Sequence, residues 1–310
     1  MFTNAVSISF VSNYYNVLLK YEAAVPANKL DCPGPGPAVP FNTTTSPTPP
    51  SEELPSFTEL LIQSKSDKYH RHHYEKFYEK WFAQYREKPS LKILEIGAEA
   101  GKSLDFWSNY FTDAALVLGL AYGVSSTGVE DKAEALKKVR VIRGDQAKSD
   151  TMAQLKAEGP FHIILDDGSH VPEHEIFSLF SLWNSIIPGG MYIIEDLETH
   201  YWKEGEKIYG YPLKNHGVNA SADKSAIAKV QQLIHVLNRH QIGRNNLSVM
   251  PGDDMLCSIE FAMNTLVLRK CTMDEAGLIP QGSFGNNINT DELDVWEEQA
   301  KASNPSPDHA

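Results

Sequence analysis

Acidic side chains stand at the ends of two apolar runs of this sequence. Asp166 and Asp167 follow one run, and Glu195 and Asp196 follow another. Like charges brought close together repel unless a cation neutralises them, and hard oxygen ligands suit magnesium, calcium or manganese. We therefore predict that Asp167, Glu195 and Asp196 hold a divalent ion. The alternative is that some of these carboxylates cap helix N-termini.

One histidine is singled out by its acidic neighbours. His170 lies three residues after Asp167, where a neutral imidazole can take a proton from a hydroxyl held at the metal. We predict that His170 is a general base. His174 and His200 are close in sequence and are weaker candidates, since most of the 11 histidines must be structural.

A glycine-bearing turn between Glu95 and Ser103 follows another apolar run and leads into a predicted helix. The turn lacks the spacing of a P-loop, and Glu99 and Lys102 stand where a dinucleotide fingerprint has its second and third glycines. Buried at the end of its run, Glu95 suits a ligand that presents an ammonium group. With Gly97, Gly101 and Ser103 it forms the predicted cofactor-binding turn, because glycines let the backbone approach a ligand closely.

Two further polar residues follow the run VRVIR. Asp145 and Gln146 combine an acid with an amide, which can accept from and donate to the edge of an adenine ring. We assign them to the cofactor site together with Asp166. The alternative for Asp145 is a solvated turn.

The pattern of apolar runs predicts how these residues meet. The runs LKILEIG, ALVLGL, VRVIRG, FHIILDD and MYIIEDL alternate with helical segments, which indicates an α/β fold with a mostly parallel, doubly wound sheet. The runs LSVM, LCSIEFAM and NTLVLRK then predict antiparallel strands that close one edge. Ligands of such sheets bind at the carboxyl ends of the strands, where the acidic residues lie. The aromatic stripe over 74–85 has helical spacing and predicts core packing.

Composition sets limits on the domains and the partners. The segments predicted are an N-terminal arm (1–25), a Pro/Ser/Thr-rich linker (26–56), a catalytic domain (57–270) and a C-terminal extension (271–310). The arm is apolar enough to dock, either on a neighbouring subunit in a homo-oligomer, over the active site, or on its own domain.

Charge and hydropathy exclude two classes of partner. The 28 Lys and Arg against 40 Asp and Glu give a net charge of −12, which disfavours nucleic acid. No apolar run reaches the roughly 20 residues of a membrane span. Without a secretory signal we expect a cytoplasmic protein. The three cysteines are too few for a disulfide framework, although one pair could form.

The combination of DDGSH with IEDL resembles the class I S-adenosylmethionine-dependent methyltransferases, and within them the metal-dependent sugar O-methyltransferases of macrolide biosynthesis. The resemblance implies a Rossmann-like fold with an antiparallel last strand, and S-adenosylmethionine over the glycine turn. It implies magnesium on Asp167, Glu195 and Asp196, and His170 as the base that deprotonates a hydroxyl of a small-molecule substrate. The matching blocks are residues 66–82, 93–111, 141–146, 163–175, 189–202 and 258–270.

One position departs from the family pattern. Ala121 stands at the end of the second strand, where the family places an acid that holds the ribose hydroxyls. Either Ser125, Ser126 or another group substitutes, or cofactor affinity is reduced, or the fold serves a different metal-assisted reaction or non-catalytic binding. Substrate specificity is expected in the loop over 197–222.

Overall fold

The computed structural model describes residues 54–123, 128–202, 205–208, 211–213, 226–240, 247–278 and 298. The predicted arm, nearly all of the linker and most of the C-terminal extension lie outside these residues, as do Ser125, Ser126 and much of the 197–222 loop. No helix among the described residues is long and apolar enough to cross a membrane.

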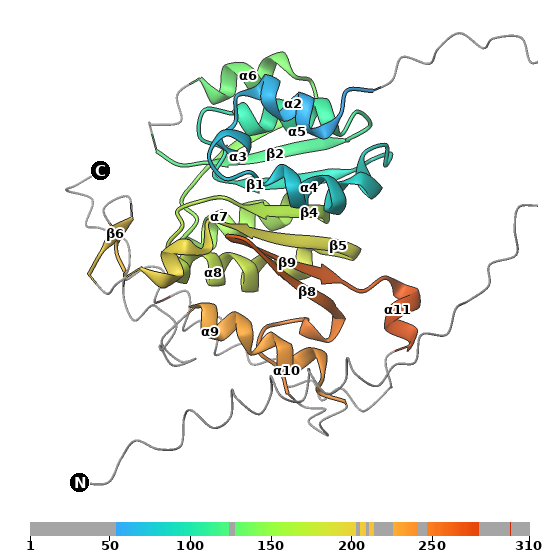
Figure 1. The fold of residues 1–310 in the computed structure, drawn as a ribbon, viewed down its shortest axis with the longest axis vertical. Coiled ribbons are helices and arrows are strands. Elements are labelled where there is room, and N and C mark those ends of the chain that lie inside the picture. The colour runs from blue at the N-terminus through green and yellow to red at the C-terminus, as the bar shows by residue number, and fades with distance from the viewer. Residues whose placement is uncertain are drawn as a thin grey trace, which may run out of the picture. The chain divides into compact units, whose positions relative to one another are not determined.

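A seven-stranded sheet forms the centre of the fold, in the order β3-β2-β1-β4-β5-β9-β8 (Figure 1). The first five strands in the chain pair in parallel, and β9 and β8 pair antiparallel. This confirms the predicted fold class. The strands are β1 (Lys92–Ile96), β2 (Leu116–Ala121), β3 (Val139–Arg143), β4 (Phe161–Asp166), β5 (Ile186–Glu195), β8 (Leu256–Ala262) and β9 (Thr265–Lys270).

Helices cover both faces of the sheet because successive residues of each strand point to opposite sides. Ile93 and Ile163 belong to one buried cluster, whereas Leu94 and Ile164 belong to the other. The first cluster packs under α2 (Phe57–Ser64), α4 (Glu75–Phe82), α5 (Lys102–Tyr110) and α6 (Val129–Ala135), and the second under α7 (Ser149–Glu158), α8 (Pro172–Leu182), α9 (Ala226–Gln231) and α10 (Leu233–Leu237). Two-sided burial explains why the parallel strands are continuous apolar runs.

The remaining elements are short. They are the helices α3 (Asp67–His70) and α11 (Met273–Leu278), the 3-10 turns η1 (Ala83–Tyr85), η2 (Trp183–Ser185), η3 (Leu197–Tyr201) and η4 (Asp253–Met255), and a two-stranded ribbon of β6 (Lys207–Ile208) and β7 (Tyr211–Pro212).

The predicted strand LSVM is wrong. Residues 247–250 form no strand, because the carboxylate of Asp253 accepts hydrogen bonds from the backbone N–H groups of Val249 and Met250 and so holds them in a turn. Both side chains are buried in the core below α10. Their apolar character therefore reflects burial of a loop.

One cysteine pair does form. Cys257 of β8 and Cys271, directly after β9, are joined by a disulfide. It links the two antiparallel strands at the edge of the sheet. The third cysteine, Cys32, lies outside the described residues.

Candidate active site

The carboxyl ends of β1, β4 and β5 bring the predicted acidic residues together. Parallel pairing places Ile96 beside Asp166 and Asp166 beside Ile194, so all three strands end at one level. This register also brings Glu95, Asp167, Glu195 and Asp196 to the same edge, because they lie at or directly after the ends of these strands. The sequence pattern predicts this meeting because strand ends share an edge.

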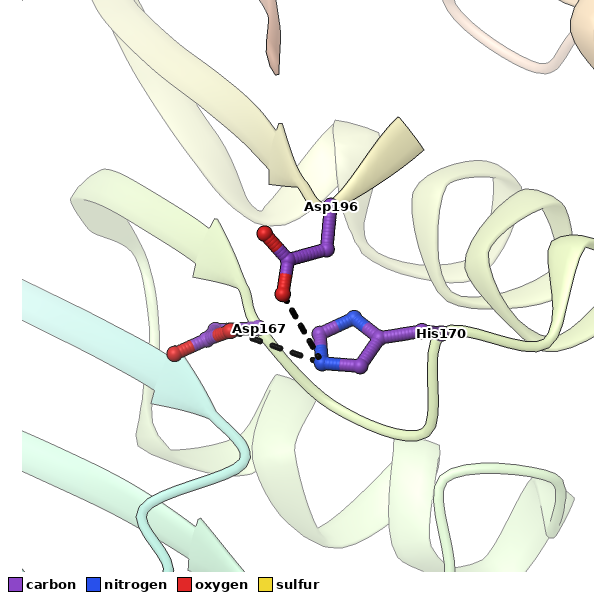
Figure 2. A group of neighbouring side chains, drawn as sticks. All are labelled: Asp167, His170 and Asp196. Carbon is purple, nitrogen blue, oxygen red and sulfur yellow. Dashed lines mark ion pairs between the residues drawn. The ribbon is translucent and has the colours of Figure 1, made fainter. Parts of the chain in front are cut away.

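Two of these acids face His170. Asp167, His170 and Asp196 each offer one ligand atom, and these atoms all lie within 4.8 Å of one another (Figure 2). The Nε2 of His170 lies 3.7 Å from Asp167 Oδ1 and 3.5 Å from Asp196 Oδ2. Both contacts are ion pairs that are longer than a typical hydrogen bond, and we call the space between the three atoms the gap. Both His170 (φ 53°) and Asp196 (φ 56°) adopt a left-handed backbone conformation. Residues other than glycine adopt it at a cost in free energy, often at functional sites.

The third predicted metal ligand has other partners. Lys68 of α3 donates from Nζ to both oxygens of Glu195 at 2.8 Å and to Asp167 Oδ2 at 2.5 Å. Its Nζ also lies 3.4 Å from Glu95. The hydroxyl of Tyr78 donates to Glu195 as well. In this structure Glu195 is therefore bound by an ammonium group and a phenol.

Burial and charge together set the ionisation of this cluster. Lys68 is 1% exposed, and burial alone would lower its pKa, but Asp167, Glu195 and Glu95 raise the pKa well above its usual value. Burial also raises the pKa of Glu95 and of Glu195, against the opposing effect of Lys68. Lys68 thus remains a cation, and the carboxylates depend on it for compensation.

Asp196 is held from its other side. Its Oδ1 accepts a hydrogen bond from the Tyr74 hydroxyl at 2.6 Å and one from the Asn264 side-chain amide at 3.2 Å, and it lies 3.3 Å from His72 Nδ1. Its other oxygen, Oδ2, points to His170. Each of the two acids that face His170 thus has one oxygen held by protein donors and one directed at the gap.

The glycine turn lies against the end of β4. Gly97 has φ 96°, and a Cβ there would collide with the backbone of Asp167 and Gly168. Gly101, at φ 74°, caps the start of α5, and the Ser103 hydroxyl donates to Glu95 at 2.6 Å. Of this predicted cofactor turn, Glu95 and Ser103 are therefore partners of each other, while Gly97 permits a close backbone approach.

The residues assigned to adenine lie partly inside the protein. The Gln146 amide donates to both oxygens of Asp166, at 2.8 and 2.9 Å, and its carbonyl accepts from Ser169 N–H at 3.0 Å. Tyr192 donates to Asp166 at 3.0 Å, and burial raises the pKa of Asp166 well above its usual value. Asp145 accepts from the N–H of Ala147 in a turn.

Ala121 ends β2 with its side chain fully buried beside α6. The next residue, Tyr122, is half exposed, and Arg143 at the end of β3 pairs with Glu130 of α6 at 2.5 Å. The last residue of β2 is therefore an alanine and not an acid.

Known proteins with a similar sequence carry the names of O-methyltransferases. No family model matches the chain. It is 32% identical over 228 residues to the 8-demethyl-8-alpha-L-rhamnosyl tetracenomycin-C 2'-O-methyltransferase of Streptomyces olivaceus, covering 70% of this chain and 55% of that protein. It is 36% identical over 140 residues to the demethylmacrocin O-methyltransferase of Streptomyces fradiae, covering 42% of this chain and 33% of that protein.

The structural comparison agrees. The MycE methyltransferase of mycinamycin biosynthesis, solved in complex with Mg, SAH and mycinamycin VI, superposes with a TM-score of 0.55 at 26% identity over 74% of this chain and 57% of that one. The resemblance to the macrolide and sugar O-methyltransferases is confirmed. The chain spans about half the length of the curated relatives that it matches.

Within this methyltransferase-like fold, four residues contact the acids of the site without having been predicted there from the sequence. Tyr74 and Tyr78 were assigned to the core-packing stripe, Asn264 stood at the start of the predicted strand NTLVLRK, and Lys68 was given no role. A sequence signal for the tyrosines existed, since a phenol on a buried helical face needs a polar partner. Nothing in the spacing indicated which acid that partner would be.

Proposed function

We propose that this chain is an S-adenosylmethionine-dependent and divalent-metal-dependent O-methyltransferase that acts on a hydroxyl of a sugar or another small natural product. The observation that carries the proposal is the gap bounded by Asp167, His170 and Asp196, three hard or borderline donors whose ligand atoms all lie within 4.8 Å of one another. The named activities of the relatives support it.

The donor set fits a divalent ion. Asp167 and Asp196 would hold it through the oxygens that face His170, and Glu195 is the further proposed ligand. When bound, the ion lowers the pKa of a coordinated hydroxyl, and S-adenosylmethionine supplies the methyl group. For Glu195 to serve as a ligand, one of its oxygens must leave Lys68 or be shared with it.

His170 is the proposed general base. Its Nε2 faces the gap between the two acids, so a hydroxyl held there lies within reach of the ring nitrogen. The imidazole would take the hydroxyl proton, and S-adenosylmethionine would supply the methyl group to the oxygen and leave as S-adenosylhomocysteine.

The cofactor turn is the proposed site for S-adenosylmethionine. The glycine turn from Glu95 to Gly101 lets the backbone approach a ligand, and buried Glu95 suits the cofactor's ammonium group. Gly97, Gly101, Ser103, Asp145, Gln146 and Asp166 complete the proposed set. Because Gln146 and Asp166 bind each other, we propose that they shape the wall of the site.

Calorimetric titration with S-adenosylmethionine, with and without magnesium, tests the proposal. Micromolar binding would mean that another group compensates for the ribose-binding acid that Ala121 replaces. No binding up to millimolar cofactor would overturn the methyltransferase proposal and favour the second candidate, a metal-assisted reaction of another kind or non-catalytic binding, for which Ala121 is the observation.

The role of His170 needs its own experiment, because the same nitrogen could be a metal ligand. For a base, His170→Ala should lower turnover about 100-fold or more and leave the affinity for Mn²⁺ within a few-fold of the unmodified protein. A large loss of Mn²⁺ affinity would make His170 a ligand instead.

A further inference from the structure

We propose that Tyr74 and Asn264 are positioning residues for the proposed metal ligand Asp196, an inference that rests on the proposed function. They hold Oδ1 of the carboxylate and thereby present Oδ2 to the gap that Asp196 shares with Asp167 and His170. Neither residue lies on β5, the strand that ends directly before Asp196, so the contact is built by the tertiary fold.

The hydrogen bonds form a closed set around one oxygen. The Tyr74 hydroxyl donates to Asp196 Oδ1 at 2.6 Å, and the Asn264 amide donates to the same oxygen at 3.2 Å and to the Tyr74 hydroxyl at 3.1 Å. The backbone N–H of Asp196 lies 3.3 Å from that hydroxyl. A carboxylate held in this way has one fixed rotamer.

Both positioning residues are themselves fixed. Tyr74 is fully buried and stacks on His72 and Tyr78, with ring centroids 5.2 and 5.5 Å apart. Asn264 occupies the β8–β9 turn at φ 61°, and its carbonyl groups accept from the N–H groups of Leu197 and Glu198. The turn is thereby tied to the chain on the far side of Asp196.

The carboxylate oxygen that Tyr74 and Asn264 do not bind is the one that lies near His170. Asp196 Oδ2 lies 3.5 Å from His170 Nε2. Residues of this kind, which orient a ligand without touching the ion, commonly change metal affinity by about 10-fold to 100-fold when they are removed. Tyr74 and Asn264 fit that description because, of the two carboxylate oxygens of Asp196, they contact Oδ1 and leave Oδ2 to the gap.

The test compares two buried tyrosines in the complete chain. Tyr74→Phe removes the hydroxyl at Asp196, and Tyr85→Phe removes one that donates to the Gly189 carbonyl, far along β5 from the site. Neither change alters the charge. Asn264→Gly is the second variant, since glycine keeps the left-handed turn while it loses the side-chain amide, both the NH2 that donates to Asp196 and the carbonyl that accepts from Glu198.

The measurement is the dissociation constant of Mn²⁺, followed by the electron paramagnetic resonance signal of the free ion. Tyr74→Phe and Asn264→Gly should each weaken binding about tenfold or more, and Tyr85→Phe should change it less than twofold. Circular dichroism checks that each variant is folded.

Several outcomes would overturn the inference. If Tyr74→Phe binds Mn²⁺ within twofold of the unmodified protein, that result alone overturns the inference. If Tyr85→Phe loses as much Mn²⁺ affinity as Tyr74→Phe, the loss reflects general destabilisation and the inference is also overturned. Absence of Mn²⁺ binding by the unmodified protein would overturn the metal-dependent function and the inference with it.

Discussion

A single ammonium group lies among three acids of the site. Lys68 contacts Asp167, Glu195 and Glu95, and two of these three carboxylates are almost completely inaccessible to water. Its removal leaves buried charges or forces them to take up protons. Breaking a buried ion pair on one side is strongly destabilising for this reason.

Lys68→Met is therefore expected to lower the free energy of unfolding by about 3–5 kcal/mol, measured by urea denaturation. Lys80→Met is the matched control, because the Lys80–Glu260 pair is exposed and should contribute less than about 1 kcal/mol. Equal effects of the two substitutions would contradict this account of Lys68.

A second buried pair predicts a pH dependence. Glu175 of α8 and His200 of η3 lie 2.5 Å apart, both about 1% exposed. Burial raises the pKa of Glu175 to about 8 and lowers the pKa of His200 to about 4. Near neutral pH both groups are therefore uncharged, and the acid donates to the ring.

The sign of the effect follows from Glu175. Its folded pKa lies above its unfolded value of 4.5, so its contribution to stability is complete below pH 4.5 and is lost as the pH rises towards 8. His200 acts in the opposite sense, but only between its folded pKa of about 4 and its unfolded value of 6.5. Between pH 6.5 and 8 Glu175 acts alone.

Across that window the free energy of unfolding of the unmodified protein should fall by up to about 1.4 kcal/mol per pH unit relative to Glu175→Gln. Urea denaturation at pH 6.5, 7.2 and 8 measures the difference. Parallel pH profiles for the two proteins would show that Glu175 does not titrate in this range.

At the scale of elements, the site depends on close contact between the glycine turn after β1 and the end of β4. Gly97 lies where any Cβ would meet the carbonyl of Asp167, and Gly168 lies against the side chain of Gln146. The turn that would carry the cofactor and the loop that carries the proposed metal ligand therefore cannot move independently.

Comparing Gly97→Ala with Gly128→Ala separates the steric cost of this contact from the cost of placing alanine at positive φ. Both glycines have positive φ, 96° and 80°, but nothing lies within 4 Å of a Cβ at Gly128. We expect Gly128→Ala to cost about 1 kcal/mol and Gly97→Ala about 2–4 kcal/mol, since overpacking adds to the backbone cost. Equal unfolding midpoints in urea would contradict the contact.

At the scale of the whole molecule, the N-terminal helices and the last hairpin complete a site that the sheet begins. The segment from α3 to α4 contributes Lys68, Tyr74 and Tyr78, and the β8–β9 turn contributes Asn264. A ligand at the strand ends consequently stabilises elements from both ends of the described chain.

Metal binding should therefore raise the melting temperature of the entire fold. At a free concentration 100 times the dissociation constant, an ion stabilises the native state by about 2.7 kcal/mol. Magnesium should shift the unmodified protein, EDTA should reverse the shift, and Asp196→Ala should abolish it. The same shift in Asp196→Ala would indicate binding elsewhere.

The sequence by itself determined the sheet and the edge at which polar groups gather. Both can be recognised from local sequence. A strand that is buried on both faces is a continuous apolar run, and the polar turn that follows it marks the end of the strand. The approach of Glu95, Asp167, Glu195 and Asp196 could be predicted from parallel pairing alone. Where burial of a loop imitated a strand, as in residues 247–250, the same reasoning was wrong.

Only the tertiary structure decided which partner each acid takes. Lys68 is 99 residues from Asp167 and 127 from Glu195, and Asn264 is 68 residues from Asp196. Periodicity carries no information about such pairs, because they arise when separate helices and turns pack on the sheet. Packing thus bound Glu195 to an ammonium group, turned Gln146 inward, and left Asp167 and Asp196 facing His170.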